Sequence, residues 1–191
     1  MNGRRVEAIA IGASAGAIQA LSRILPALPA GYPIPVLVIV HIPADHADLL
    51  APLFQARCVL VVKEAEDKEP ILPGFVYFGP SDYHLLVEAD RTVALSSDEP
   101  VLYSRPSIDV LFESAADAYG EGLVGVILTG ANEDGAAGLQ AVAAAGGVAL
   151  AENPEDAFAP TMPTAALARC PAVQSMSLDA IAAYLVSLGA S

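Results

Sequence analysis

Ser14, His41 and Asp134 are the side chains in this sequence whose types could together carry out acyl transfer. In that chemistry an imidazole takes the proton of a serine hydroxyl, while a carboxylate fixes the tautomer of the imidazole and stabilises the imidazolium that forms. The three residues lie far apart along the chain. The chemistry therefore depends on whether the secondary-structure elements bring them together.

Ser14 lies in a short glycine-containing segment, Gly12-Ala-Ser-Ala-Gly16, between an apolar run at residues 8–11 and an amphipathic stretch. The apolar side chains of that stretch recur at helical spacing from Ile18 to Leu28, so the pattern predicts a strand, a tight turn and a helix. Such a turn places the hydroxyl beside the free N–H groups of a helix N-terminus. The spelling matches the G-x-S-x-G pattern of nucleophile elbows, although similar turns also occur only to bend the chain and cap a helix.

His41 and Asp134 each follow a predicted buried strand. His41 comes directly after the apolar run at residues 36–40, and Asp134 lies in the turn after a second run at residues 123–128. Strands buried on both faces are typical of parallel sheets, in which ligands bind beyond the carboxyl ends of the strands. We therefore expect Ser14, His41 and Asp134 to meet at one edge of a sheet.

The remaining pattern alternates strands with helices. Helices are predicted at residues 45–55, from the N-cap Ser107 to Gly120, at 136–145 and at 178–188, and further strands at 59–62 and 148–151. Short strands at 75–78, 85–88 and 92–95, joined by tight turns, indicate an antiparallel excursion. Residues 152–162 are expected to form an irregular loop. The prediction is an α/β fold of the three-layer αβα type, with a mostly parallel sheet.

Each candidate residue also has an ordinary structural explanation. His41 alone could be a structural histidine at a strand end, and Asp134 could simply cap the following helix. His46 and His84 are expected to be surface or loop residues. The convergence of three suitable side chains on one edge favours the catalytic interpretation.

Length and composition exclude several classes of protein. With 191 residues the chain suits a single domain over residues 1–191, and its net charge of −13 argues against a nucleic-acid partner. No apolar run reaches the roughly 18 residues that span a bilayer, and no secretory signal is evident, so we expect a cytoplasmic protein that is not membrane-inserted. Cys58 and Cys170 have no metal-site or redox spacing and are expected to be reduced, buried thiols.

Two familiar α/β classes do not fit the order of the candidate residues. An α/β-hydrolase places its acid between serine and histidine, whereas here the order is Ser14, His41, Asp134. The sequence also lacks a dinucleotide-binding fingerprint, because only Gly12 and Gly16 are present and no acidic residue ends the second strand.

Motifs spread over most of the chain resemble the catalytic domain of the chemotaxis protein-glutamate methylesterases, the CheB type. They are Ile11-Gly-Ala-Ser-Ala-Gly16, Val40-His-Ile-Pro43, Pro73-Gly-Phe-Val-Tyr77 with Pro80 and His84, Arg105-Pro-Ser-Ile-Asp-Val-Leu-Phe112, Ile127-Leu-Thr-Gly130, Asp134-Gly-Ala-Ala-Gly138 and Met162-Pro163. The resemblance implies a three-layer αβα domain that hydrolyses glutamyl methyl esters on chemoreceptor cytoplasmic helices, with glutamine deamidation as a side activity in some members.

The same resemblance assigns roles to residues. It implies a triad of Ser14, His41 and Asp134, with the backbone N–H groups of His41 and Ala131 binding the oxyanion. It implies no metal and no organic cofactor. The partners expected are methylated chemoreceptor helices and, because the catalytic strand begins within ten residues of Met1 and leaves no fused receiver domain, a possible separate response-regulator protein.

The sequence departs from the family pattern near Asp134. The family usually reads Thr-Gly-Met-Gly where this chain has Thr129-Gly-Ala-Asn132, and His-Met-Pro where it has His41-Ile-Pro43. Alanine still supplies a backbone N–H, but loss of the methionine side chain changes the pocket. Two alternatives therefore stay open: a binding module of the same fold that is catalytically weak or inactive, and a related esterase that acts on another small acyl substrate.

Overall fold

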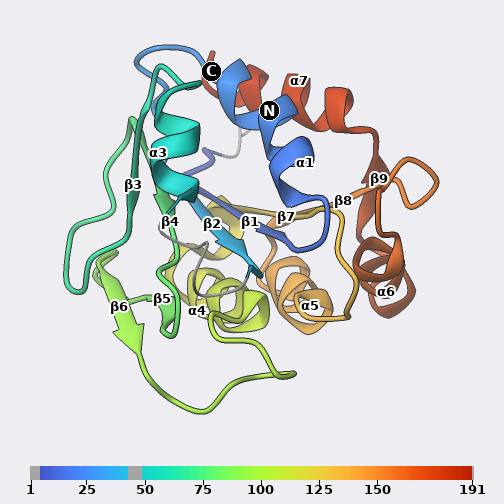
Figure 1. Cartoon of the computed structure of the whole chain (residues 1–191). Coiled ribbons are helices and arrows are strands. Elements are labelled where there is room, and N and C mark those ends of the chain that lie inside the picture. The colour runs from blue at the N-terminus through green and yellow to red at the C-terminus, as the bar shows by residue number, and fades with distance from the viewer. Residues whose placement is uncertain (1–4, 43–48, 191) are drawn as a thin grey trace.

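A seven-stranded parallel sheet forms the centre of the protein. The computed structural model describes residues 5–42 and 49–190. The strand order is β3-β4-β2-β1-β7-β8-β9, and every neighbouring pair is parallel (Figure 1). The strands are β1 (Ala8–Ala13), β2 (Val36–Val40), β3 (Val61–Glu64), β4 (Phe75–Phe78), β7 (Leu123–Ile127), β8 (Val148–Glu152) and β9 (Gln174–Met176).

Helices cover both faces of this sheet, which confirms the three-layer α/β prediction. One face carries α1 (Ala17–Ile24), α3 (Leu50–Gln55) and α7 (Leu178–Leu188), together with the 3₁₀ turn η1 (Leu25–Ala27). The other carries α4 (Ile108–Tyr119), α5 (Ala136–Ala144) and α6 (Thr161–Arg169), and the 3₁₀ turn η2 (Gly120–Gly122) joins α4 to β7.

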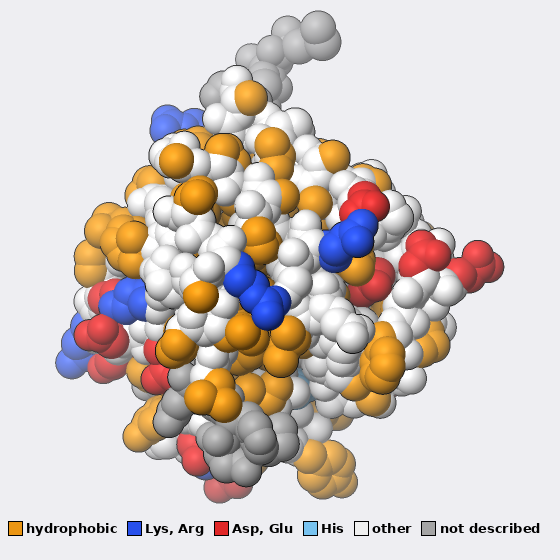
Figure 2. Space-filling model, turned by 45° about the horizontal axis from the view of Figure 1, so that its top comes forward, with side chains coloured by type: hydrophobic (Ala, Val, Ile, Leu, Met, Phe, Trp, Pro, Cys, Tyr) orange, Lys and Arg blue, Asp and Glu red, His pale blue; other side chains and the backbone are white. Residues whose placement is uncertain are grey.

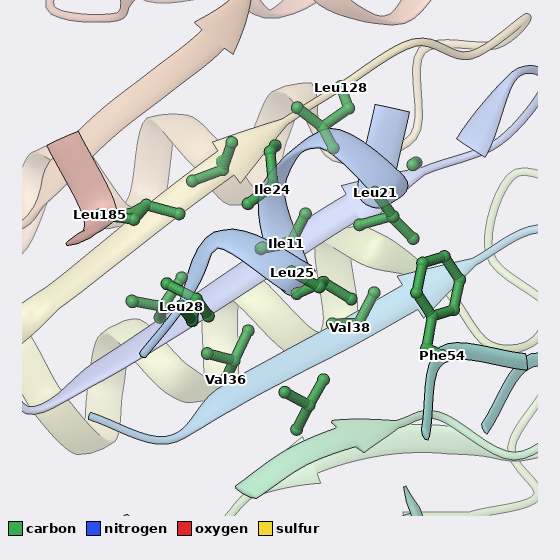
Figure 3. Packing of buried hydrophobic residues seen from close by; sticks show 14 of the residues in the cluster. Ile11, Leu21, Ile24, Leu25, Leu28, Val36, Val38, Phe54, Leu128 and Leu185 are labelled. Atoms are coloured by element: carbon green, nitrogen blue, oxygen red, sulfur yellow. The ribbon is translucent and has the colours of Figure 1, made fainter. Parts of the chain in front are cut away.

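The core is split in two by the sheet because successive side chains of a strand point to opposite faces. Ile9 and Ile11 of β1 belong to the cluster under α1 and α7, whereas Ala8 and Ala10 belong to the cluster under α4 and α5. Figure 3 shows the first cluster, in which Leu185 and Phe54 approach the strands from different helices. All six residues of β1 are buried, as expected for a central parallel strand.

The prediction for residues 75–78 was wrong in one respect. They form β4, which lies parallel between β3 and β2, and only β5 (His84–Val87) and β6 (Val93–Ser96) form the antiparallel pair. The physical reason is burial on both faces: Val76 and Phe78 pack into one core cluster and Tyr77 into the other. The tight turns in this region made a central parallel strand resemble the start of a hairpin.

Three other boundaries differ from the sequence prediction. The third strand covers residues 61–64 rather than 59–62, and Val59 is exposed. The predicted loop at residues 152–162 is found at residues 153–160, and it is followed by α6 and the short edge strand β9, neither of which was predicted. α3 begins at Leu50 with Pro52 in its first turn, where proline is tolerated. Residues 45–48 of that predicted helix, including His46, lie outside the described residues.

Two expectations about individual side chains have different outcomes. Cys58 and Cys170 are free and buried, as predicted. His84 is not a surface residue: its Nε2 bonds with the Glu99 carbonyl at 3.0 Å and its Nδ1 accepts from the Ser107 N–H at 3.1 Å, because it packs where β5 meets the start of α4. Among the helices in the described ranges, none has the length and hydropathy needed to cross a bilayer.

Candidate active site

The three candidate residues lie beyond the carboxyl ends of adjacent strands. Ser14 follows β1 and His41 follows β2, while Asp134 lies between β7 and α5. Because β2, β1 and β7 are neighbours in the sheet, the three loops meet at one edge, as the sequence predicted. Ser14 and His41 line one pocket of about 370 Å³.

The loop of Ser14 is held against the loop after β7. The Ser14 N–H donates to the Thr129 carbonyl at 2.9 Å, and the Thr129 hydroxyl donates to the Ala15 carbonyl at 2.8 Å. The buried Glu152 carboxylate accepts the Thr129 N–H at 2.8 Å. These bonds fix the serine backbone relative to the strand that leads to Asp134.

Both glycines of the serine turn are required by close packing. Gly16 has φ +84°, and a Cβ added there would lie 2.8 Å from Cβ of Phe158. A Cβ on Gly12 would lie 2.3 Å from Cγ2 of Ile108. The turn can therefore pack against Phe158 and the N-terminus of α4 only because these positions lack side chains.

His41 and Asp134 form the central contact of the site. His41 Nε2 lies 2.8 Å from Asp134 Oδ2, and the carboxylate is fully buried while the imidazole is 12% exposed. A carboxylate can only accept, so Nε2 carries the proton of the neutral imidazole and Nδ1 keeps its lone pair. Nδ1 is therefore the nitrogen that can act as a base.

The N-terminus of α4 stabilises the Asp134 carboxylate. Besides the bond with His41, the Asp134 carboxylate accepts hydrogen bonds from the N–H groups of Ile108 at 2.7 Å and Asp109 at 3.0 Å. It also accepts one from the Ser107 hydroxyl at 2.9 Å. Burial by itself raises the pKa of Asp134, but the hydrogen bonds from His41, Asp109 and Ile108 outweigh it, so the pKa lies below its usual value. Asp134 thus remains an anion that can stabilise a protonated His41.

Asp109 binds the backbone that follows Asp134 through its side chain. Its Oδ1 accepts the N–H groups of Gly135 at 3.0 Å and Gly138 at 2.6 Å, at the start of α5. Burial raises the pKa of Asp109 to about 6, and the nearby Asp134 charge adds to the rise, against the opposing bonds from the two glycines. In the sequence, Asp109 stands out only as part of the motif at residues 105–112, and this role was not predicted.

The side chain of Asn132 also belongs to the site, which was not predicted from the sequence. Its Oδ1 accepts the Asp134 N–H at 3.1 Å, which leaves its Nδ2 facing His41 Nδ1 at 3.4 Å. Its amide orientation follows from these bonds, since only the oxygen can accept from a backbone N–H. Its position two residues before Asp134, in a turn, was the signal available in the sequence.

Comparison with known proteins identifies the family. A model described as CheB methylesterase matches residues 9–185. The chain belongs to the CheB methylesterase family. A Leptospira interrogans relative named putative protein-glutamate methylesterase/protein-glutamine glutaminase is 44% identical over 182 residues, covering 95% of this chain and 94% of the relative.

Other members of the CheB family agree with this match. A Chromohalobacter salexigens protein-glutamate methylesterase/protein-glutamine glutaminase is 39% identical over 93% of this chain but only 51% of its own length. The crystal structure of the Thermotoga maritima CheB methylesterase catalytic domain superimposes with a TM-score of 0.91 at 33% identity, covering 96% of this chain and 98% of that one. The fold and the family resemblance expected from the sequence are thereby confirmed.

The two backbone donors expected from the CheB family are in different states. The Ala131 N–H forms no hydrogen bond with the described part of the chain, and Ala131 is exposed. The His41 N–H donates to the Ala13 carbonyl at 3.1 Å and extends the ladder between β1 and β2. Of these two donors, only the Ala131 N–H is therefore without an acceptor among the described residues.

Proposed function

We propose that this chain is a protein-glutamate methylesterase that hydrolyses glutamyl methyl esters through Ser14, His41 and Asp134. The observation that carries the proposal is the 2.8 Å contact between His41 Nε2 and Asp134, beside the pocket that His41 shares with Ser14. The names of the relatives support the choice of ester. Both relatives match more than nine-tenths of this chain in sequence, which supports a shared function more strongly than a shared fold alone would.

In the first half of the proposed reaction, Ser14 Oγ attacks the ester carbonyl while His41 Nδ1 takes the hydroxyl proton. The imidazolium so formed is stabilised by the buried Asp134 anion. When the tetrahedral intermediate collapses, the C–O bond to the methoxy group breaks and the imidazolium protonates it to methanol. A glutamyl ester of Ser14 remains.

In the second half, His41 Nδ1 takes a proton from water, and the hydroxide attacks the acyl group. Collapse breaks the bond to Ser14 Oγ, which recovers its proton from His41, and the product is a free glutamate side chain. The Ala131 N–H is the donor that binds the oxyanion in both steps. The His41 N–H contributes only if its 3.1 Å bond to Ala13 lengthens as the substrate binds.

The same groups suit hydrolysis of a glutamine side chain, with ammonia replacing methanol as the leaving group. The relative from Leptospira interrogans carries both activities in its name. We propose methylated chemoreceptor cytoplasmic helices as the substrate, a cytoplasmic location, and a separate response regulator as a possible controlling partner. No cofactor or metal takes part in the proposed steps.

A binding module without turnover is the second candidate function. The observation in its favour is that Ser14 Oγ forms no hydrogen bond with His41 in the described structure, while Asn132 occupies Nδ1. Catalytic hydrogen bonds are often long or absent before substrate binds, so this geometry does not by itself exclude the esterase.

The experiment that separates the two is labelling with a fluorophosphonate probe, followed by methanol release from methylated receptor. Wild-type protein should be labelled at Ser14 and should release methanol. Ser14→Ala should lose both while keeping its melting temperature, with turnover reduced by several orders of magnitude. Unlabelled, well-folded wild-type protein that binds receptor without releasing methanol would instead establish the binding module.

A further inference from the structure

Arg105 has an unused hydrogen-bonding edge beside the catalytic histidine. Its Nη1 donates to the carbonyls of Ser97 at 3.0 Å and Asp98 at 3.1 Å, which anchors the guanidinium. Its Nε is buried and has no partner, and Nη2 forms no hydrogen bond with the described residues. A buried donor without a partner costs roughly 1–3 kcal/mol, so such an atom calls for an explanation.

The geometry of the guanidinium identifies what would fit there. Nε and Nη2 lie on the same side of the planar group and point two N–H bonds in parallel, which matches the two oxygens of a carboxylate. Nη1, on the other side, is already committed to the protein. The free edge is therefore the bidentate one.

The position of Arg105 connects this edge to the active site. Arg105, Tyr103 and His41 line a pocket of about 310 Å³, and His41 also lines the Ser14 pocket of about 370 Å³. Ile42 is common to both as well. The two pockets thus adjoin at His41 and Ile42, and a peptide bound with its ester at Ser14 would have neighbouring side chains near Arg105.

The charge of the protein makes this cation unusual. The chain carries 9 Lys and Arg against 22 Asp and Glu. On the face shown in Figure 2, the Lys and Arg side chains mostly stand apart from one another rather than form a patch. A guanidinium with unpaired donors beside the histidine is therefore a local attraction for an anion in a protein whose net charge repels anions.

We propose that Arg105 is a specificity-determining residue that binds a carboxylate of the substrate protein, on the segment that carries the ester. This inference rests on the proposed esterase function. A carboxylate that bonds with Nη2 at the pocket also places its second oxygen against the orphan Nε, so binding satisfies both donors. Substrates with an acidic side chain flanking the ester are preferred over neutral ones.

The test uses two synthetic peptides that each carry one glutamyl methyl ester, flanked by glutamates in one and by glutamines in the other. Dissociation constants are measured on a Ser14→Ala background, so that no turnover occurs. The Glu peptide should bind about 10- to 100-fold more tightly, as expected for charge-assisted hydrogen bonds. Adding Arg105→Met should abolish the preference, and Arg105→Lys should keep only part of it.

Matched controls separate recognition from a structural role. Arg169→Met removes the same charge from an exposed side chain of α6, whose Nε bonds with Gln140, and should leave the preference intact. The melting temperature and circular dichroism spectrum of Arg105→Met should match those of the wild-type protein, so that a lost preference is not a loss of folding. Equal binding of the two peptides, or a preference that survives Arg105→Met, overturns the proposal.

Because binding is measured without turnover, the outcome does not depend on the esterase reaction. Absence of methanol release from either peptide with wild-type protein would refute the proposed function alone. A preference for the Glu peptide that depends on Arg105 would still establish the carboxylate site.

Discussion

Asn132 bridges the two residues of the proposed charge pair: its side-chain oxygen is bound by the Asp134 N–H, and its Nδ2 lies 3.4 Å from His41 Nδ1. Nδ1 has one lone pair, so it cannot accept well from both Asn132 and Ser14. The contact is long and hence weak. In the proposed mechanism, this contact has to yield to the serine hydroxyl when substrate binds.

Replacing Asn132 with glycine should therefore increase the reactivity of Ser14. We expect fluorophosphonate labelling to accelerate about two- to fivefold, which corresponds to one weak hydrogen bond of roughly 0.5–1 kcal/mol. Asn153→Gly is the matched control, because Asn153 Oδ1 accepts the Glu155 N–H at 3.2 Å in the same kind of turn without touching His41. Slower labelling of Asn132→Gly would mean that the amide orients the imidazole for catalysis.

Asp134→Asn should cost far more than its change in shape suggests. An amide at this position can no longer stabilise the imidazolium as an anion does, and its NH₂ group opposes the protonated Nε2. We expect kcat for ester hydrolysis to fall about 10³- to 10⁴-fold, measured by methanol release, with circular dichroism to verify folding. A loss below tenfold would remove Asp134 from the proposed mechanism.

The raised pKa of Asp109 predicts that the folded protein loses stability as the pH rises. Its pKa rises from the usual value of about 3.9 to about 6, so between these pH values the folded state binds more protons than the unfolded state. Stability contributed by protonated Asp109 is therefore complete below about pH 4 and is lost as pH rises through 6.

Asp109→Asn removes this dependence, since the amide oxygen can still accept from Gly135 and Gly138. Relative to wild type, the variant should gain on the order of 3 kcal/mol between pH 4 and pH 7. Urea unfolding at the two pH values measures this difference. Parallel stability curves for the two proteins would show that Asp109 ionises normally in the fold.

Gly12→Ala tests the close approach of β1 to α4. The new Cβ would lie 2.3 Å from Cγ2 of Ile108, so one of the two elements must shift, and we expect a loss of about 1–3 kcal/mol in unfolding free energy. Ile108→Ala removes the obstructing atom. The double variant should lose less unfolding free energy than the sum of the losses in the two single variants, because Gly12→Ala then meets no clash. Strict additivity would place the strain elsewhere.

Local pattern was sufficient for much of this protein. The apolar runs before Ser14 and His41 predicted two buried parallel strands, and the rule that ligands gather at carboxyl ends placed both residues and Asp134 at one edge. This works because strand burial and strand direction are both recorded in short stretches of sequence. The same logic predicted the strand β4 but not its parallel pairing, since pairing partners depend on the order of strands in the sheet, which no local pattern contains.

Tertiary structure alone decided the interactions within the site. That His41 uses Nε2 toward Asp134, that the N-terminus of α4 keeps this carboxylate ionised, and that Asn132 faces Nδ1 all depend on which helix end meets which turn. The position of the Arg105 guanidinium depends on the carbonyls of Ser97 and Asp98, in the segment just before it. Hydrogen bonds between segments tens of residues apart form only when packing sets their distance and angle, and the sequence carries that information collectively rather than in any motif.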